Sequence, residues 1–214
     1  MSLLVLQGAV EQGFIYALVA LGLYISFRTL DIADLTTDGT FTLGAAVSAV
    51  FTVQGQPLLG VVLAFFCGAL AGFVTALLQT KLGVQPILAG IITMTALYSV
   101  NLMVMGKPNI NFFKEKTIFT AAEAMPGGFG SLLQAAAITA VLCVLLVLFL
   151  RTQLGLSLRA TGDNRDMVSA SSINPAFTTT VGLCLSNAVV ALSGALIAQY
   201  QKFADNTLGT GMVV

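Results

Sequence analysis

The sequence contains no histidine, and only 8% of its 214 residues are charged. Without histidine, histidine-based catalysis and the usual zinc sites are excluded. The scarcity of charge also excludes an ordinary soluble domain, in which about a quarter of the residues are charged. Because the net charge is zero and lysine and arginine form no cluster, no nucleic-acid partner is expected.

Cysteine is scarce as well. Cys67, Cys143 and Cys184 lie in three separate apolar runs, without the spacing of a metal site or a redox pair. We interpret them as small buried hydrophobic residues, and no metal or cofactor is expected. The N-terminus lacks the basic region of a signal peptide, so we interpret it as the start of a first membrane span.

Apolar residues dominate what is present. They make up 57% of the chain, the mean hydropathy is +0.96, and residues 41–80, 82–106, 124–150 and 167–201 carry no charge. A helix needs about 20 apolar residues to cross the hydrocarbon layer, and each of these runs is long enough. The sequence therefore predicts an all-α, polytopic integral membrane protein, with residues 1–214 forming one transmembrane helix bundle.

The apolar pattern predicts the individual spans. They are residues 3–27, a short apolar run at 41–53, residues 58–80, a span that follows a break at 83–86 and ends at 105, and residues 132–150 and 176–200. The run at 41–53 can cross the membrane only if it recruits part of the polar stretch 28–40. Gly68 and Gly72 form a GxxxG pattern, which is typical of close helix packing. The connection 106–131 is predicted to be a surface lid or interfacial helix.

The basic residues give a prediction of orientation. With these spans, five of them fall on one side (Arg28, Lys81, Arg151, Arg159 and Arg165) and four on the other (Lys107, Lys114, Lys116 and Lys202). The positive-inside rule then places the connection 152–175 in the cytoplasm and the N-terminus outside. An extra short crossing within residues 28–40 would reverse the assignment of the N-terminus.

The connection 152–175 contains the pattern of a short helix. Asp163 is a candidate N-cap with Asp166 three positions later, and Asn174 followed by Pro175 is typical of the start of the last span. Such a helix fits two interpretations, a docking surface for a partner or a solvated turn between spans.

Two blocks of sequence favour the docking surface over the solvated turn, because they resemble a known family. Residues 13–49 read "GFIYALVALGLYISFRTLDIADLTTDGTFTLGAAVSA", and residues 157–196 read "SLRATGDNRDMVSASSINPAFTTTVGLCLSNAVVALSGAL". Both resemble permease subunits of bacterial ABC importers, in the branch that serves branched-chain amino acids, ribose-like sugars and nucleosides. The resemblance is nearest to a group of single-permease systems, some of whose binding proteins are similar to aromatic amino-acid binders. Relatives continue through further spans beyond "LGTGMVV", so the chain is expected to be either truncated or a shortened core.

The resemblance implies a function and a set of partners. It implies a multi-pass permease in the bacterial inner membrane, with a discontinuous second segment and a cytoplasmic coupling helix. The partners would be two ATPase subunits, a second permease copy forming a homodimer, and an extracytoplasmic solute-binding protein. The chain itself would not be an enzyme. The residues expected to couple to the ATPase are Arg159, Gly162, Asp163, Asn164, Arg165 and Met167.

The polar stretch would then line the path of a small polar solute, an amino acid first and a sugar or nucleoside next. The candidate lining residues are Thr36, Thr37, Asp38, Thr40, Thr95 and Asn101. A carboxylate at the bilayer centre costs about 2.5–3.5 kcal/mol, so burial of all three aspartates of the stretch is not expected. We expect Asp31 near the headgroups and Asp38 deepest, as N-cap of the following helix, with or without a role toward the solute. Helix–helix hydrogen bonding is the alternative for Thr95 and Asn101.

Two other functions compete with an importer subunit. An ion-coupled secondary transporter would use buried carboxylates to carry protons or sodium ions. An intramembrane enzyme is disfavoured, because the sequence holds no Ser/His, paired-carboxylate or HExxH constellation.

Overall fold

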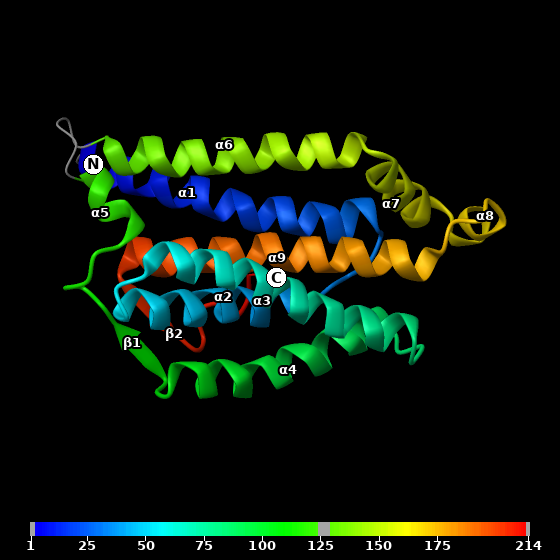
Figure 1. Cartoon of the computed structure of the whole chain (residues 1–214), viewed down its shortest axis with the longest axis horizontal. Coiled ribbons are helices and arrows are strands. Elements are labelled where there is room, and N and C mark those ends of the chain that lie inside the picture. Colours follow the sequence, from blue (N-terminus) through cyan, green and yellow to red (C-terminus); the bar gives the residue numbers. More distant parts are fainter. Residues whose placement is uncertain (1–2, 124–128, 213–214) are drawn as a thin grey trace.

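The chain forms a bundle of long helices that lie side by side along one axis (Figure 1). The structure, a computed structural model, describes residues 3–123 and 129–212. Its elements are α1 (Leu3–Leu23), the π-helix η1 (Tyr24–Thr29), α2 (Thr36–Val53), α3 (Pro57–Thr80), α4 (Pro86–Met105), β1 (Asn109–Asn111), α5 (Ile118–Glu123), α6 (Gly130–Arg151), α7 (Gln153–Asp163), α8 (Arg165–Ala170), α9 (Pro175–Gln201) and β2 (Phe203–Asp205). The predicted all-α membrane architecture is confirmed.

Five helical segments within the described residues are long and apolar enough to cross a membrane. They are Val5–Thr29, Pro57–Thr80, Pro86–Met105, Gly130–Arg151 and Pro175–Gln201, and each corresponds to a predicted span. The sixth predicted span is α2, which recruits residues 36–40 of the polar stretch as its first turn. Because α2 packs against α3, α4 and α9, its threonines face protein rather than lipid.

The core lies where α2, α3 and α9 meet. A Cβ atom on Gly44 of α2 would overlap the carbonyl oxygen of Ala191 on α9, so these two backbones are in direct contact. Gly68 and Gly72 of α3 press against the same helix, which confirms the GxxxG prediction of a packing face. The position of α9 is therefore fixed by glycine on both neighbours.

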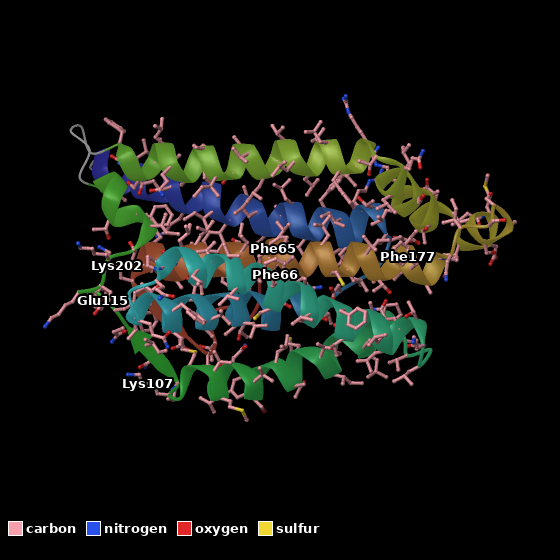
Figure 2. The ribbon with its side chains drawn as sticks, viewed as in Figure 1. Phe65, Phe66, Lys107, Glu115, Phe177 and Lys202 are labelled. Atoms are coloured by element: carbon pink, nitrogen blue, oxygen red, sulfur yellow. The ribbon has the colours of Figure 1, made fainter. Side chains whose placement is uncertain are left out.

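The ends of the bundle carry the polar connections. In Figure 1, α3 and α6 end on the same side, where α7 and α8 project, and β1, β2 and α5 lie on the opposite side. Figure 2 shows Lys107, Glu115 and Lys202 gathered at the end with β1 and β2. Helix α1 begins at the end opposite α7 and α8, and residues 30–35, between η1 and α2, contain no helix. The structure thus provides no extra crossing that would reverse the predicted orientation.

The connection 106–131 contains a short strand as well as a helix. Strand β1 pairs antiparallel with β2, with Ile110 opposite Ala204, and this pairing ties the end of α4 to the end of α9. Helix α5 follows, and residues 124–128 of the predicted lid lie outside the described residues.

Candidate functional site: a polar seam and a pocket on either side of α2

The chain returns into the bundle between η1 and α2 without regular structure. Residues 30–35 lead from the end of η1 to the start of α2, which lies partway along the bundle (Figure 1). Irregular backbone at membrane depth must find its hydrogen bonds within the protein. Here the Ser26 hydroxyl donates to the Ile32 carbonyl at 2.7 Å, and the Ile32 N–H donates to the Ser26 carbonyl at 3.0 Å. The discontinuous segment is therefore held by the end of the first helix.

Asp34 is the deeply buried carboxylate of this segment, with none of its surface exposed. Its Oδ1 accepts the Thr36 backbone N–H at 2.9 Å, and its Oδ2 accepts the Asn187 amide N–H at 2.7 Å. Asp34 thus binds the N–H of the first residue of α2 and joins the start of α2 to the middle of α9. Because both oxygens accept from N–H donors, the burial of this side chain is compensated.

Threonine hydroxyls extend the contacts of Asp34 to a third helix. The Thr40 hydroxyl donates to Asn187 Oδ1 at 2.7 Å, and the hydroxyls of Thr36 and Thr75 lie 2.9 Å apart. All of these side chains are fully buried. We call this set the Asp34 cluster; its members are Asp34, Thr36, Thr40, Thr75 and Asn187.

The expectation that Asp38 lies deepest and caps α2 is wrong. Asp38 is already the third residue of α2 and is only partly buried, the N-cap position belongs to Leu35, and Asp34, four residues before Asp38, is the buried carboxylate. Asp31 is exposed. The reason is that burying a carboxylate requires donors on neighbouring elements, and only position 34 meets the amide of Asn187.

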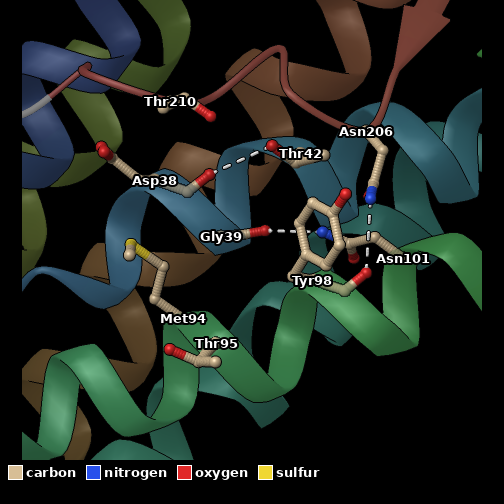
Figure 3. Close-up of a pocket in the computed structure, with 9 residues that line it drawn as sticks. All are labelled: Asp38, Gly39, Thr42, Met94, Thr95, Tyr98, Asn101, Asn206 and Thr210. Atoms are coloured by element: carbon tan, nitrogen blue, oxygen red, sulfur yellow. Dashed lines mark hydrogen bonds between the residues drawn. The ribbon is translucent and has the colours of Figure 1, made fainter. Parts of the chain in front are cut away.

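Asp38 instead lines a pocket of about 260 Å³ between α2, α4 and the segment that follows β2 (Figure 3). The pocket is lined by Asp38, Gly39, Thr42, Met94, Thr95, Tyr98, Asn101, Asn206 and Thr210. We call it the Asp38 pocket. The Asn101 amide N–H donates to the Gly39 carbonyl at 3.2 Å, and the Gly211 N–H donates to Asp38 Oδ2 at 2.9 Å. These bonds fix the two polar side chains at the walls.

The six predicted path residues therefore separate into two groups. Asp38, Thr95 and Asn101 line the pocket, whereas Thr36 and Thr40 belong to the Asp34 cluster, are fully buried and do not line this pocket. The Thr37 hydroxyl donates to the Asp34 carbonyl at 3.1 Å and is also fully buried. Among the described residues, no three His, Cys, Asp or Glu side chains could hold a metal ion.

Sequence reasoning missed Asn187 and Thr75 as members of the Asp34 cluster. A signal existed for Asn187, since it is the one asparagine within the uncharged residues 176–200. An amide in such a span is expected to face another helix. The sequence gave no reason to expect that Thr75 contacts another helix, because a threonine hydroxyl can donate to a carbonyl of its own helix. Thr75 does so as well, toward the Ala71 carbonyl at 3.2 Å.

The N-cap residue of α8 differs from the prediction. Asn164, not Asp163, is the N-cap of α8, and its Oδ1 accepts the N–H groups of Asp166 and Met167, each at 3.0 Å. Asp163 is the last residue of α7, where the extended backbone of Asn164 ends that helix. The other cap is confirmed, because Asn174 Oδ1 accepts the N–H groups that follow Pro175.

The predicted coupling residues occupy different surroundings. Arg159, Arg165 and Met167 are exposed, and Met167 has 70% of its surface accessible. Gly162 faces inward, since a Cβ atom there would overlap the Thr29 carbonyl oxygen. The exposed residues can contact a partner, whereas Gly162 lets α7 lie directly on the end of η1.

Residues 5–214 match the family model described as "Branched-chain amino acid transport system / permease component". The chain belongs to this permease family. A multi-pass location in the inner membrane follows from the family and the apolar helices, and the permease is a transport subunit.

Three curated relatives differ in what their names say. A tyrosine transport system permease protein of Clostridioides difficile (strain R20291) is 38% identical over 204 residues, which are 95% of this permease and 67% of the relative. The uncharacterized protein RP368 of Rickettsia prowazekii (strain Madrid E) is 34% identical over 210 residues, 98% of this chain and 73% of its own. The galactofuranose transporter permease protein YtfT of Escherichia coli (strain K12) is 29% identical over 194 residues, which are 88% of this chain and 54% of the relative. No solved structure matches this chain.

Proposed function

We propose that this permease is the membrane-spanning subunit of an ATP-driven importer and that α7 and α8 form the docking site for its ATPase. The observation that carries the proposal is the projection of α7 and α8 beyond one end of the bundle (Figure 1). Three basic residues, Arg151 at the end of α6 and Arg159 and Arg165 in the connection, lie at this end, which is the cytoplasmic side by the positive-inside rule.

The surface of α8 suits a protein partner. The Asn164 cap fixes its first turn, Val168 is buried, and Met167 presents an unbranched apolar side chain to solvent. A small capped element with an exposed methionine beside arginine has the composition of a protein contact. Two ATPase subunits would engage two such elements, one on each copy of a permease homodimer.

The transported solute is proposed to be small and polar, with an amino acid favoured over a sugar. The support is the name of the tyrosine permease relative, which has higher identity than the galactofuranose relative. An extracytoplasmic binding protein would deliver the solute at the end with β1 and β2.

Copurification tests the docking proposal. Arg165→Glu reverses the charge on α8, and we expect at least about tenfold less ATPase subunit to copurify, as a lost interface contact of 1.4 kcal/mol or more would give. The matched control is Lys114→Glu, an equal charge reversal at an exposed residue at the opposite end. Equal recovery of the ATPase with both variants would contradict the proposal.

An uptake assay separates this function from the ion-coupled alternative, which the buried carboxylate of Asp34 keeps open. In proteoliposomes holding the assembled importer and its binding protein, uptake should stop when ATP is removed. Uptake that persists without ATP and stops when the proton gradient is collapsed would support the alternative.

A further inference from the structure

The Asp38 pocket contains acceptor atoms without donors. The oxygens Asn101 Oδ1, Asn206 Oδ1 and Asp38 Oδ1 are buried and have no hydrogen-bond partner among the described residues. Asn101 is 1% exposed and Asn206 is 6% exposed, so neither side chain can turn freely to solvent. The amide nitrogens of both asparagines are already used, toward the carbonyls of Gly39 and Tyr98 (Figure 3).

Leaving a buried acceptor without a donor costs about 1–3 kcal/mol, and more when the group is charged. Buried polar atoms in folded proteins therefore nearly always have a partner, which can be a ligand or an ordered water. Since the free groups here are all acceptors, the missing partner must donate hydrogen bonds. A carboxylate, which only accepts, cannot fill this role.

The charge of the pocket further limits which donor group can bind there. Asp38 is the only charged side chain among the nine residues that line the pocket. A sugar hydroxyl could donate to the amide oxygens, but it would leave the charge of Asp38 without a counter-charge. An ammonium group donates up to three hydrogen bonds and also carries a positive charge.

We propose that the Asp38 pocket is a binding site for the ammonium group of a small amine-bearing solute, such as an amino acid. Asp38 supplies the counter-charge to the ammonium group, and Asn101, whose amide lies on the far side of Gly39 from the Asp38 carboxylate (Figure 3), supplies a buried acceptor for another donor group of the solute. Tyr98 and Met94 offer an aromatic and a thioether surface to the remainder of the solute. The volume of about 260 Å³ lies just below the roughly 300–1,000 Å³ of pockets for drug-sized ligands, which fits a solute of this size. This inference rests on the proposed function for the identity of the solute, but the charge preference of the pocket can be tested without transport.

The test uses a cysteine placed in the pocket of the full chain in detergent. Thr95 lines the pocket, is exposed, and its hydroxyl donates to the Ile91 carbonyl of its own helix, so Thr95→Cys disturbs little. The native residues Cys67, Cys143 and Cys184 are first replaced by alanine. The new thiol is then labelled with methanethiosulfonates that carry a trimethylammonium group, a sulfonate group or no charge.

We expect the cationic reagent to react about tenfold faster than the anionic one, because a cleft lined by one sign of charge concentrates counter-ions. Asp38→Asn should remove most of this preference. The matched control Asp31→Asn makes the same change at an exposed residue outside the pocket, where asparagine accepts the positive φ of 54°, and should keep the preference. The uncharged reagent shows whether each variant is folded with the pocket open.

Three results would overturn the proposal: no labelling of Thr95→Cys by any reagent, equal rates for both charges, or a preference that survives Asp38→Asn. Compounds that protect the new thiol from labelling identify the class of solute that the pocket binds. Tyramine, which has an amine and no carboxylate, should slow labelling, and 3-(4-hydroxyphenyl)propionate, which has the reverse, should not. Because no ATPase is present, these outcomes do not depend on ATP-driven uptake, whose failure would count against the proposed function alone.

Discussion

Asp34 and Asp38 lie one helical turn apart and have opposite surroundings. Asp34 is enclosed by α2, α3 and α9, and each of its oxygens accepts an N–H group from the protein. Asp38 lies at the wall of a pocket and keeps one oxygen without a partner among the described residues. The comparison separates a carboxylate whose two oxygens are satisfied by the protein from one that keeps an unpartnered oxygen at a pocket wall, and only the second fits the proposed role toward a solute.

The largest effect on stability is expected at Asp34. In Asp34→Asn, the NH₂ of the new amide must point at the N–H of either Thr36 or Asn187, so a repulsive contact replaces one of the two hydrogen bonds. We expect the free energy of unfolding to fall by about 2–4 kcal/mol. Chemical or thermal unfolding in detergent measures it. Asp31→Asn, at an exposed position, should stay within about 0.5 kcal/mol, and equal losses in both variants would contradict the structural role.

A smaller loss is expected where α2 contacts α9. Gly44→Ala places a methyl group on the Ala191 carbonyl, and overpacking of this kind costs about 1–3 kcal/mol. Gly13→Ala is the matched control, because a Cβ atom there would meet nothing within 4 Å. If both variants unfold at the same denaturant concentration, the contact of α2 with α9 is looser than the structure shows.

Removing one hydroxyl of the Asp34 cluster should lower the free energy of unfolding by a still smaller amount. Thr40→Val keeps the shape of the side chain and deletes its hydrogen bond to Asn187, so a loss of about 1 kcal/mol is expected. Thr95→Val removes a hydroxyl at an exposed position of the pocket and should change the unfolding free energy by less than about 0.5 kcal/mol. An inverted order would break the distinction between the cluster and the pocket.

The smallest effect on stability, with a clear effect on transport, is expected at Asp38. In Asp38→Asn the remaining carbonyl oxygen can still accept the Gly211 N–H, so the unfolding free energy should change by less than about 0.5 kcal/mol. Uptake of an amino acid should fall about tenfold or more, in line with a lost counter-charge. Wild-type uptake by this variant would remove Asp38 from the transport path.

The sequence allowed the spans and the packing role of Gly68 and Gly72 to be predicted, because these depend on local composition. It did not identify which aspartate is buried. That outcome depends on Asn187, which lies 153 residues from Asp34 along the chain. Pairing between distant elements leaves no periodic signal, so the spacing of the three aspartates gave no reason to favour Asp34.

The cap of α8 shows a second limit. Asp163 and Asn164 are adjacent and both are good N-caps, so residue preference cannot decide between them. The decision comes from α7, whose helical turns continue through Asp163 and leave Asn164 as the first residue with extended backbone. Sequence patterns place a short helix to within a residue or two, and the preceding helix sets the exact start.

The contact of Gly162 with the Thr29 carbonyl has a mechanical consequence. Since not even a methyl group fits between them, α7 cannot approach the bundle without displacing the backbone that leads, five residues later, to Asp34. A force applied at α7 by a protein outside the membrane would thereby reach the start of α2, whose opposite face forms the wall of the pocket. Spin labels on α7 and α2 that keep a constant separation throughout ATP turnover would show that no such transmission takes place.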